Sequence, residues 1–164
     1  MTDIAHEKCI LLVEDNPDDV ALTLRALKQN RIVNHVVVAN DGAEARDFLF
    51  GVGTHEGRDV CEVPQLILLD LKIPKISGLD LLRRIRAFEH TKLVPVVILT
   101  SSPLEEDLIN GYGLGANSYV RKPLDYKEFF EAIRNIGIYW LAINKPPPEP
   151  HLPRDRAADE SAVR

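Results

Sequence analysis

Five short apolar runs alternate with longer segments of helical character along this chain. The runs occupy residues 9–13, 35–39, 66–69, 96–99 and 118–120. Strands that alternate with helices favour βαβ units, in which the strands lie parallel in one sheet. This alternation restricts the chain to an α/β architecture.

The segments between the runs carry the signals of helices. Asn16 suits the cap of the first helix and Pro17 its first turn, and residues 41–50 and 78–89 predict the second and third helices. Apolar residues at helical spacing mark the last two segments, namely Leu104, Leu108 and Ile109, and then Phe129, Ile133, Ile136 and Trp140. Five strands and five helices in strict alternation predict a flavodoxin-like, doubly wound parallel sheet with strand order 2-1-3-4-5.

Polar side chains follow the ends of four of these predicted strands. Glu14 and Asp15 come after the first run, Asp70 after the third, Thr100 after the fourth and Lys122 shortly after the fifth. The carboxyl ends of parallel strands meet at one edge of the sheet, where open α/β folds bind ligands. We therefore expect these five side chains to lie together.

Three carboxylates at one edge require a cation. Two carboxylates about 4 Å apart repel by roughly 4 kcal/mol at an effective dielectric constant of 20. Oxygen ligands without clustered His or Cys favour Mg²⁺ over zinc. A carboxylate such as Asp70 beside this metal would attack a phosphoryl group, and Lys122 and Thr100 would stabilise the phosphoryl oxygens.

Each of these residues also has an ordinary structural explanation. Asp70 would cap a turn, Thr100 would cap a helix, and a lysine such as Lys122 is commonly a solvated charge. Tyr119 would be half-buried packing in the sheet, and Glu14 with Asp15 would be a solvated strand end. The joint placement of five such groups at four strand ends favours the functional interpretation.

Length and composition exclude several classes of protein. The chain of 164 residues suits one domain, and its net charge of -5 argues against a nonspecific nucleic-acid or membrane surface. Cys9 and Cys61 form no CxxC pair and are expected to be reduced. No apolar run approaches the roughly 20 residues of a membrane span, and residues 1–8 lack the apolar core of a signal peptide. We expect a cytoplasmic protein with protein partners.

The predicted organisation is one domain with two extensions. Residues 1–7 form an N-terminal extension, 8–144 the domain, and 145–164 a proline-rich and then polar tail that is expected to be flexible. Residues 51–64 have three glycines and no sustained period, so they predict a long loop of the kind that is often functional.

With these residues in place, the chain resembles the CheY-like receiver domain of two-component response regulators from about Lys8 to Ile143. The resemblance implies that Asp70 accepts a phosphoryl group from a sensor histidine kinase. It implies Asp15 and Asp70 as direct Mg²⁺ ligands, together with the backbone carbonyl of Lys72, while Glu14 acts through water. Beyond its own phosphorylation and dephosphorylation, such a protein would not be an enzyme.

The resemblance also assigns a switch. Thr100 and Lys122 would contact the phosphoryl oxygens, and Thr100 with Tyr119 would couple phosphorylation to the protein surface. The chain departs from the family at Glu14, where Asp is more frequent, and at Ser101, where a smaller residue is usual. The longer Glu14 side chain changes the reach toward the metal but keeps the charge.

A narrower resemblance is to the small response regulators of cyanobacterial and bacterial phytochromes. It rests on the loop at residues 51–64 and on Ile138, Tyr139, Trp140 and Leu141 before the prolines. These two features are less specific than the acidic residues.

We expect output to pass through the domain surface, because the tail is too short to build an output domain. Phosphorylation would repack the fourth helix, fifth strand and fifth helix. Tyr139, Trp140 and Ile143 extend the apolar pattern of the last helix and predict the interface of a homodimer. The proline-rich tail would dock across the partner as an arm, or else have no role.

Other functions remain open at this stage. The chain would act as a phosphorylation-independent pseudo-receiver that only binds partners, or as a phosphate shuttle or sink in a phosphorelay. A phosphatase or phosphotransferase with an aspartyl-phosphate intermediate would need a substrate-recognition motif, and none is evident. An FMN or nucleotide binder would need a phosphate-binding loop after the first strand, where Glu14 and Asp15 stand instead.

Overall fold

The sheet of this protein has the predicted composition and strand order. The computed structural model describes residues 8–149. Its five strands are all parallel and lie in the order β2-β1-β3-β4-β5. They are β1 (Ile10–Val13), β2 (Val36–Ala39), β3 (Leu66–Leu69), β4 (Val96–Thr100) and β5 (Ser118–Arg121). The predicted doubly wound α/β fold is confirmed, and β1 and β3 are neighbours.

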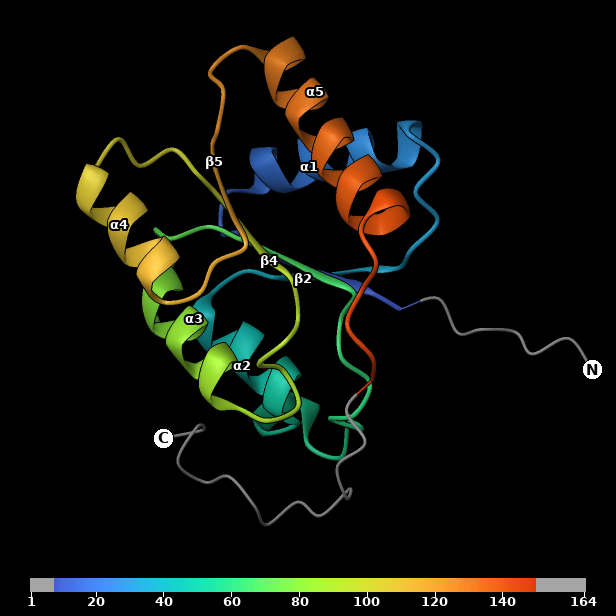
Figure 1. The fold of residues 1–164 in the computed structure, drawn as a ribbon, viewed down its shortest axis with the longest axis vertical. Helices are drawn as coiled ribbons and strands as arrows, with labels where there is room; N and C mark the ends of the chain where they lie inside the picture. The colour runs from blue at the N-terminus through green and yellow to red at the C-terminus, as the bar shows by residue number, and fades with distance from the viewer. Residues whose placement is uncertain (1–7, 150–164) are drawn as a thin grey trace, which may run out of the picture.

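The helices cover the sheet on both faces. They are α1 (Pro17–Gln29), α2 (Gly42–Phe50), α3 (Gly78–Ala87), α4 (Glu105–Gly113) and α5 (Tyr126–Gly137). Figure 1 shows α1 and α5 on one face and α2, α3 and α4 on the other. A π-helical segment, η2 (Ile138–Ile143), extends α5, and a short 3-10 helix, η1 (Gly53–His55), lies within the predicted loop. Within residues 8–149, no helix combines the length and the apolar character needed to span a membrane.

The central strands are buried on both faces, as a parallel sheet between two layers of helices requires. Every residue of β1, β3 and β4 is buried. Leu11, Ile67 and Ile98 belong to the core under α2 and α3, whereas Leu12 and Leu68 belong to the core under α1 and α5. Successive residues of these strands therefore pack into opposite cores, and both cores hold the sheet between the two helix layers.

Side-chain caps begin four of the five helices. Asn16, Asp41, Ser77 and Asp125 each accept a hydrogen bond from the backbone at the start of α1, α2, α3 and α5. The predicted cap at Asn16 is confirmed by hydrogen bonds of 2.9 and 3.3 Å that its side-chain oxygen accepts from the backbone amides of Asp18 and Asp19. Helix α4 has no side-chain cap, because Leu104 occupies that position.

Helix α4 also differs from the other helices in what it buries. Leu104, Leu108 and Ile109, whose spacing predicted a helix, are 51%, 38% and 64% exposed. The buried residues of α4 are instead Asp107 and Gly111. A Cβ atom on Gly111 would lie only 2.8 Å from Cδ1 of Ile98. The glycine therefore lets the helix lie close to the sheet.

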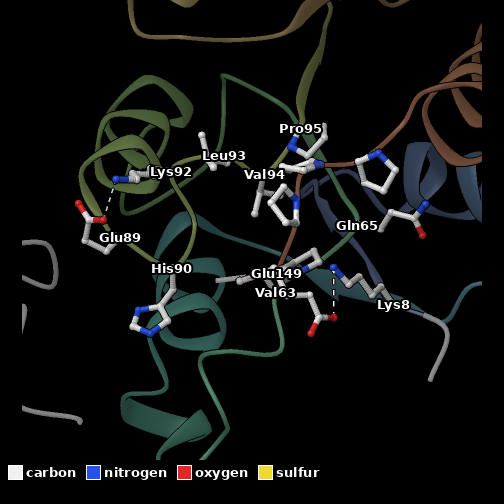
Figure 2. A pocket seen from close by; sticks show the side chains of 14 residues that line it. Lys8, Val63, Gln65, Glu89, His90, Lys92, Leu93, Val94, Pro95 and Glu149 are labelled. Atoms are coloured by element: carbon white, nitrogen blue, oxygen red, sulfur yellow. Dashed lines mark ion pairs between the residues drawn. The ribbon is translucent and has the colours of Figure 1, made fainter. Parts of the chain in front are cut away.

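The described part of the tail returns to its own domain. Figure 2 shows a pocket that is lined by Pro146, Pro147 and Pro148 of the tail and by Pro95 and other residues near the amino ends of β3 and β4. An ion pair of 3.4 Å joins Lys8 to Glu149 across this region. The rest of the predicted tail and the N-terminal extension lie outside the described residues.

Gly78 allows α3 to begin against the backbone of the third strand's end. Its amide donates a 3.0 Å hydrogen bond to the carbonyl of Leu71. A Cβ atom at this position would lie 2.4 Å from the carbonyl oxygen of Asp70 and 2.6 Å from Cα of Leu71. Because both contacts are with backbone, a larger residue would displace the segment that presents Asp70.

We predict that Gly78→Ala lowers the free energy of unfolding by about 1–3 kcal/mol, the usual cost of overpacking. Urea denaturation followed by circular dichroism would measure it. Gly113→Ala is the matched control, because no atom lies within 4 Å of its Cβ position. Equal stability of the Gly78 and Gly113 variants would contradict the prediction.

Candidate functional site

Three carboxylates converge at the carboxyl edge of the sheet. Glu14 and Asp15 directly follow β1, and Asp70 directly follows β3, which is paired with β1 in parallel register. One carboxylate oxygen from each of the three lies within 4.8 Å of the others. Glu14 and Asp70 are buried and Asp15 is exposed, so the cluster has a buried base and an open side.

Lys122 brings a positive charge into this cluster. The Lys122 side chain is 7% exposed, and its ammonium nitrogen lies 2.8 Å from Oδ2 of Asp70 and 2.8 Å from Oδ2 of Asp19. It also donates a hydrogen bond to Oε2 of Glu14. Asp19 belongs to α1 and was not predicted as a site residue, since its place in the first turn suggested only a role at the helix terminus.

The ionisation of the cluster follows from burial and pairing. Burial raises the pKa of Glu14 to about 7, the bond from Lys122 opposes this shift, and the charge of Asp70 adds to it. Burial alone would lower the pKa of Lys122, but bonds to Asp19, Asp70 and Glu14 outweigh burial and raise it above the ordinary value. Lys122 therefore stays charged at neutral pH.

The donor set fits a hard divalent cation. Mg²⁺ binds oxygen ligands at about 2.0–2.1 Å, so oxygens on opposite sides of the ion lie about 4 Å apart. The spacing within the cluster is close to this arrangement. The single ammonium of Lys122 leaves an excess of negative charge among Glu14, Asp15, Asp19 and Asp70, which a divalent ion would neutralise.

Lys72 lies beside Asp70 through its backbone. Its amide donates a 3.1 Å hydrogen bond to Oδ1 of Asp70. This bond fixes the orientation of the carboxylate and holds the start of the following loop close to the cluster. The role of the Lys72 carbonyl as a metal ligand stays a prediction.

Thr100 and Tyr119 lie on the neighbouring strands β4 and β5. Thr100 is fully buried, and its hydroxyl oxygen accepts a 3.3 Å hydrogen bond from the amide of Ser102. Tyr119 pairs with Ile98 in the parallel ladder. Its hydroxyl is buried and makes no hydrogen bond of normal geometry within residues 8–149. Burial raises the pKa of Tyr119, and the nearby Ser102 hydroxyl opposes this shift. Their coupling as a switch stays a prediction.

The residues of the predicted interface lie elsewhere. Tyr139 and Ile143 are 48% and 67% exposed in η2, and Trp140 is partly buried against the core under α1 and α5. Asp70 follows the carboxyl end of β3, whereas η2 follows α5, which begins beyond the carboxyl end of β5 and runs back along the sheet (Figure 1).

A second residue near the site was missed from the sequence. Asp107 of α4 is buried and contacts Ser102 and Lys72. Its only sequence signal is its place in an acidic first turn after Glu105 and Glu106. Acidic residues are common at helix amino ends, so this pattern did not single it out.

Known proteins are similar to this chain in fold and in sequence. A family model described as the response regulator receiver domain matches residues 10–134. The response regulator Rcp1 of Synechocystis sp. is 38% identical over 134 residues, which cover 82% of this chain and 89% of Rcp1.

Solved structures give the same result. The phosphorylated cyanobacterial phytochrome response regulator RcpA superimposes with a TM-score of 0.81 and 34% identity, covering 87% of this chain and 99% of RcpA. The Mn²⁺-bound form of Rcp1 superimposes with a TM-score of 0.80 and 37% sequence identity, covering 86% of this chain and 99% of Rcp1. The bacteriophytochrome response regulator AtBRR superimposes with a TM-score of 0.66 and 46% sequence identity, covering 84% of this chain and 98% of AtBRR.

The raised pKa of Glu14 generates a prediction about metal binding. A proton and a metal ion compete for the cluster, so Mg²⁺ affinity is expected to rise as Glu14 ionises. Between about pH 6 and pH 8 a group with a pKa near 7 passes from roughly one-tenth to nine-tenths ionised. The affinity for Mg²⁺ should therefore rise by up to about tenfold over this range. Isothermal titration calorimetry at each pH would measure this dependence.

Glu14→Gln should weaken Mg²⁺ binding at pH 8 and flatten the pH dependence. Asp18→Asn removes the same charge from an exposed position on α1 and should keep the dependence of the unsubstituted protein. An equally steep dependence in the Glu14 variant would show that another group takes up the proton.

Proposed function

Because the chain belongs to the response regulator receiver family, we propose that it accepts a phosphoryl group on Asp70 from a sensor histidine kinase in a Mg²⁺-dependent reaction. The observation that carries this proposal is the convergence of Glu14, Asp15 and Asp70, with Lys122 bonded to Asp70. The protein is not a conventional enzyme, because it acts on its own side chain. We place it in the cytoplasm, where it meets the kinase.

The proposed chemistry is a transfer between two side chains. A carboxylate oxygen of Asp70 attacks the phosphorus of a phosphohistidine, a P–O bond forms, the P–N bond breaks, and the imidazole nitrogen keeps the electron pair. Mg²⁺ held by Asp15, Asp70 and the Lys72 carbonyl, with Glu14 acting through water, would neutralise phosphoryl charge.

Lys122 and Thr100 serve the transferred group in this proposal. The Lys122 ammonium, already 2.8 Å from Oδ2 of Asp70, pairs with a phosphoryl oxygen after a small movement. The Thr100 hydroxyl gives up the hydrogen bond that it accepts from the Ser102 amide and donates a hydrogen bond to another phosphoryl oxygen. Both groups therefore act where negative charge accumulates.

We propose that this exchange is also the signal. Movement of Thr100 toward the phosphoryl group makes room for Tyr119, whose buried hydroxyl makes no hydrogen bond of normal geometry in the described part of the chain. The result is a shift between two conformations of the surface formed by α4, β5 and α5. A downstream protein would read that surface.

The proposed kinase is a phytochrome. The support is the similarity to Rcp1, RcpA and AtBRR, of which RcpA and AtBRR are phytochrome response regulators. The domain that receives the phosphoryl group is proposed to comprise residues 8–144, with residues 145–164 as its tail.

We predict that a small phosphodonor such as acetyl phosphate adds one phosphoryl group to the protein when Mg²⁺ is present. Intact mass spectrometry would detect a gain of about 80 Da, which Asp70→Asn would lose because its amide is a poor nucleophile. Asp80→Asn, at an exposed position in α3, is the matched control and should be phosphorylated normally. The proposal would be wrong if the Asp70→Asn variant gained a phosphoryl group, or if the unsubstituted protein gained none.

We also propose that the exposed apolar side chains of η2 form a homodimer interface. Tyr139→Ser combined with Ile143→Ser should reduce the mass seen by light scattering from two chains to one, since both side chains are exposed. Leu93→Ser, which removes another exposed apolar side chain outside η2, should leave the dimer intact. A one-chain mass for the unsubstituted protein at all concentrations, phosphorylated or not, would exclude this dimer.

A further inference from the structure

One oxygen of Asp107 joins the two loops that flank the phosphorylation site. Oδ2 of Asp107 accepts a 2.6 Å hydrogen bond from the hydroxyl of Ser102 and lies 3.3 Å from the ammonium nitrogen of Lys72. Lys72 is two residues beyond Asp70, and Ser102 is two residues beyond Thr100. Helix α4 is therefore tied to both strand ends through a single carboxylate.

Helix α4 depends on its buried carboxylate because it lacks the side-chain cap that begins each of the other described α-helices. The remaining four described α-helices have side-chain caps, whereas α4 has none. Asp107 is 8% exposed, while Leu104 and Ile109 on the same segment are mostly exposed. Asp107 thus supplies buried polar contacts to a helix that has neither a side-chain cap nor a large buried apolar side chain.

Lys72 contacts one neighbour through its backbone and another through its side chain. Its backbone amide donates to Oδ1 of Asp70 at 3.1 Å, but its ammonium is paired with Asp107. The Lys72 side chain is 61% exposed, so little packing restricts the ammonium to its present position. A positive charge next to Asp70 is therefore held away from it by an anion on α4.

We propose that Asp107 is a positioning residue that holds the Lys72 ammonium on α4 while Asp70 is unmodified and releases it when Asp70 carries a phosphoryl group. This inference rests on the proposed function. The phosphoryl group adds negative charge beside Lys72, so the ammonium meets a second anion that competes with Asp107. Its transfer removes one of the bonds that tie α4 to the loop after β3.

The Tyr119 hydroxyl is placed to donate a hydrogen bond to the Asp107 carboxylate after Lys72 has left it. This hydroxyl is buried and makes no hydrogen bond of normal geometry in the described residues. After burial, the charge of Asp107 is the largest cause that raises the pKa of Tyr119, whereas the nearby Ser102 hydroxyl lowers it. When Lys72 leaves, Asp107 has a free acceptor position and Tyr119 is a nearby donor. Release of Lys72 and movement of Tyr119 are then two parts of one change.

The test uses beryllofluoride, an unreactive mimic of a phosphoryl group, with Mg²⁺ and the full chain. Asp107→Asn keeps an acceptor for Ser102 but loses the charge that holds Lys72. Its dissociation constant for beryllofluoride, measured by calorimetry, should fall about two- to fivefold, the range expected for an ion pair with one exposed partner. Glu105→Gln removes the same charge from an exposed position in the same helical turn and should change nothing.

A double-mutant cycle separates positioning from a general structural role. In a Lys72→Met background, Asp107→Asn should no longer alter the affinity, because there is no ammonium to release. An unchanged affinity in the single Asp107 variant, or an equal change with Met at position 72, would overturn the inference. If the unsubstituted protein does not bind beryllofluoride, or binds it equally after Asp70→Asn, the proposed function fails and the inference fails with it.

Amide hydrogen exchange provides a second measurement that does not require an Asp107 variant to fold. Lys72→Met alters an exposed side chain and should speed exchange about two- to fivefold at the hydrogen-bonded amides of α4, from Leu108 onward. Beryllofluoride should produce the same increase in the unsubstituted protein and no further increase in the variant. Exchange in α4 that is insensitive to Lys72→Met would overturn the inference.

Discussion

The arrangement of the site depends on one buried ammonium among carboxylates. Lys122 contacts Glu14, Asp19 and Asp70, which come from the ends of β1 and β3 and from α1. Without the cation these carboxylates would repel one another, and without them the ammonium would be buried unpaired, which is strongly unfavourable. The groups therefore stabilise one another, but with Asp15 added, one ammonium faces four carboxyl groups, of which Glu14 is partly protonated at neutral pH. The cluster is stable enough to fold and still attracts a divalent ion.

Much of this architecture could be predicted because it is encoded in local patterns. Strand order and parallel pairing follow from the alternation of apolar runs with helices, since few topologies satisfy that alternation. The positions of Asp70, Asp15 and Lys122 follow in turn, because a residue directly after a parallel strand has only one edge at which to lie. A local pattern was sufficient for these residues since the sheet itself supplies the long-range geometry.

The contacts of Asp19 and Asp107 could not be predicted in the same way. Both residues are in the first turn of a helix, where acidic residues are favoured whatever they contact. Their partners, Lys122 and Lys72, are distant in sequence, and the pairing depends on how each helix is rotated against the sheet. For α4 the apolar residues gave no guide to that rotation, because Leu104, Leu108 and Ile109 face solvent.

The small buried surface of α4 has a consequence for the cooperativity of the fold. A helix that buries a carboxylate and a glycine, rather than large apolar side chains, contributes little to the hydrophobic free energy of the domain. It therefore forms a unit of low local stability on a core that β1, β3 and β4 hold independently. The position of this helix can therefore change at a small cost in free energy while the buried central strands stay in place.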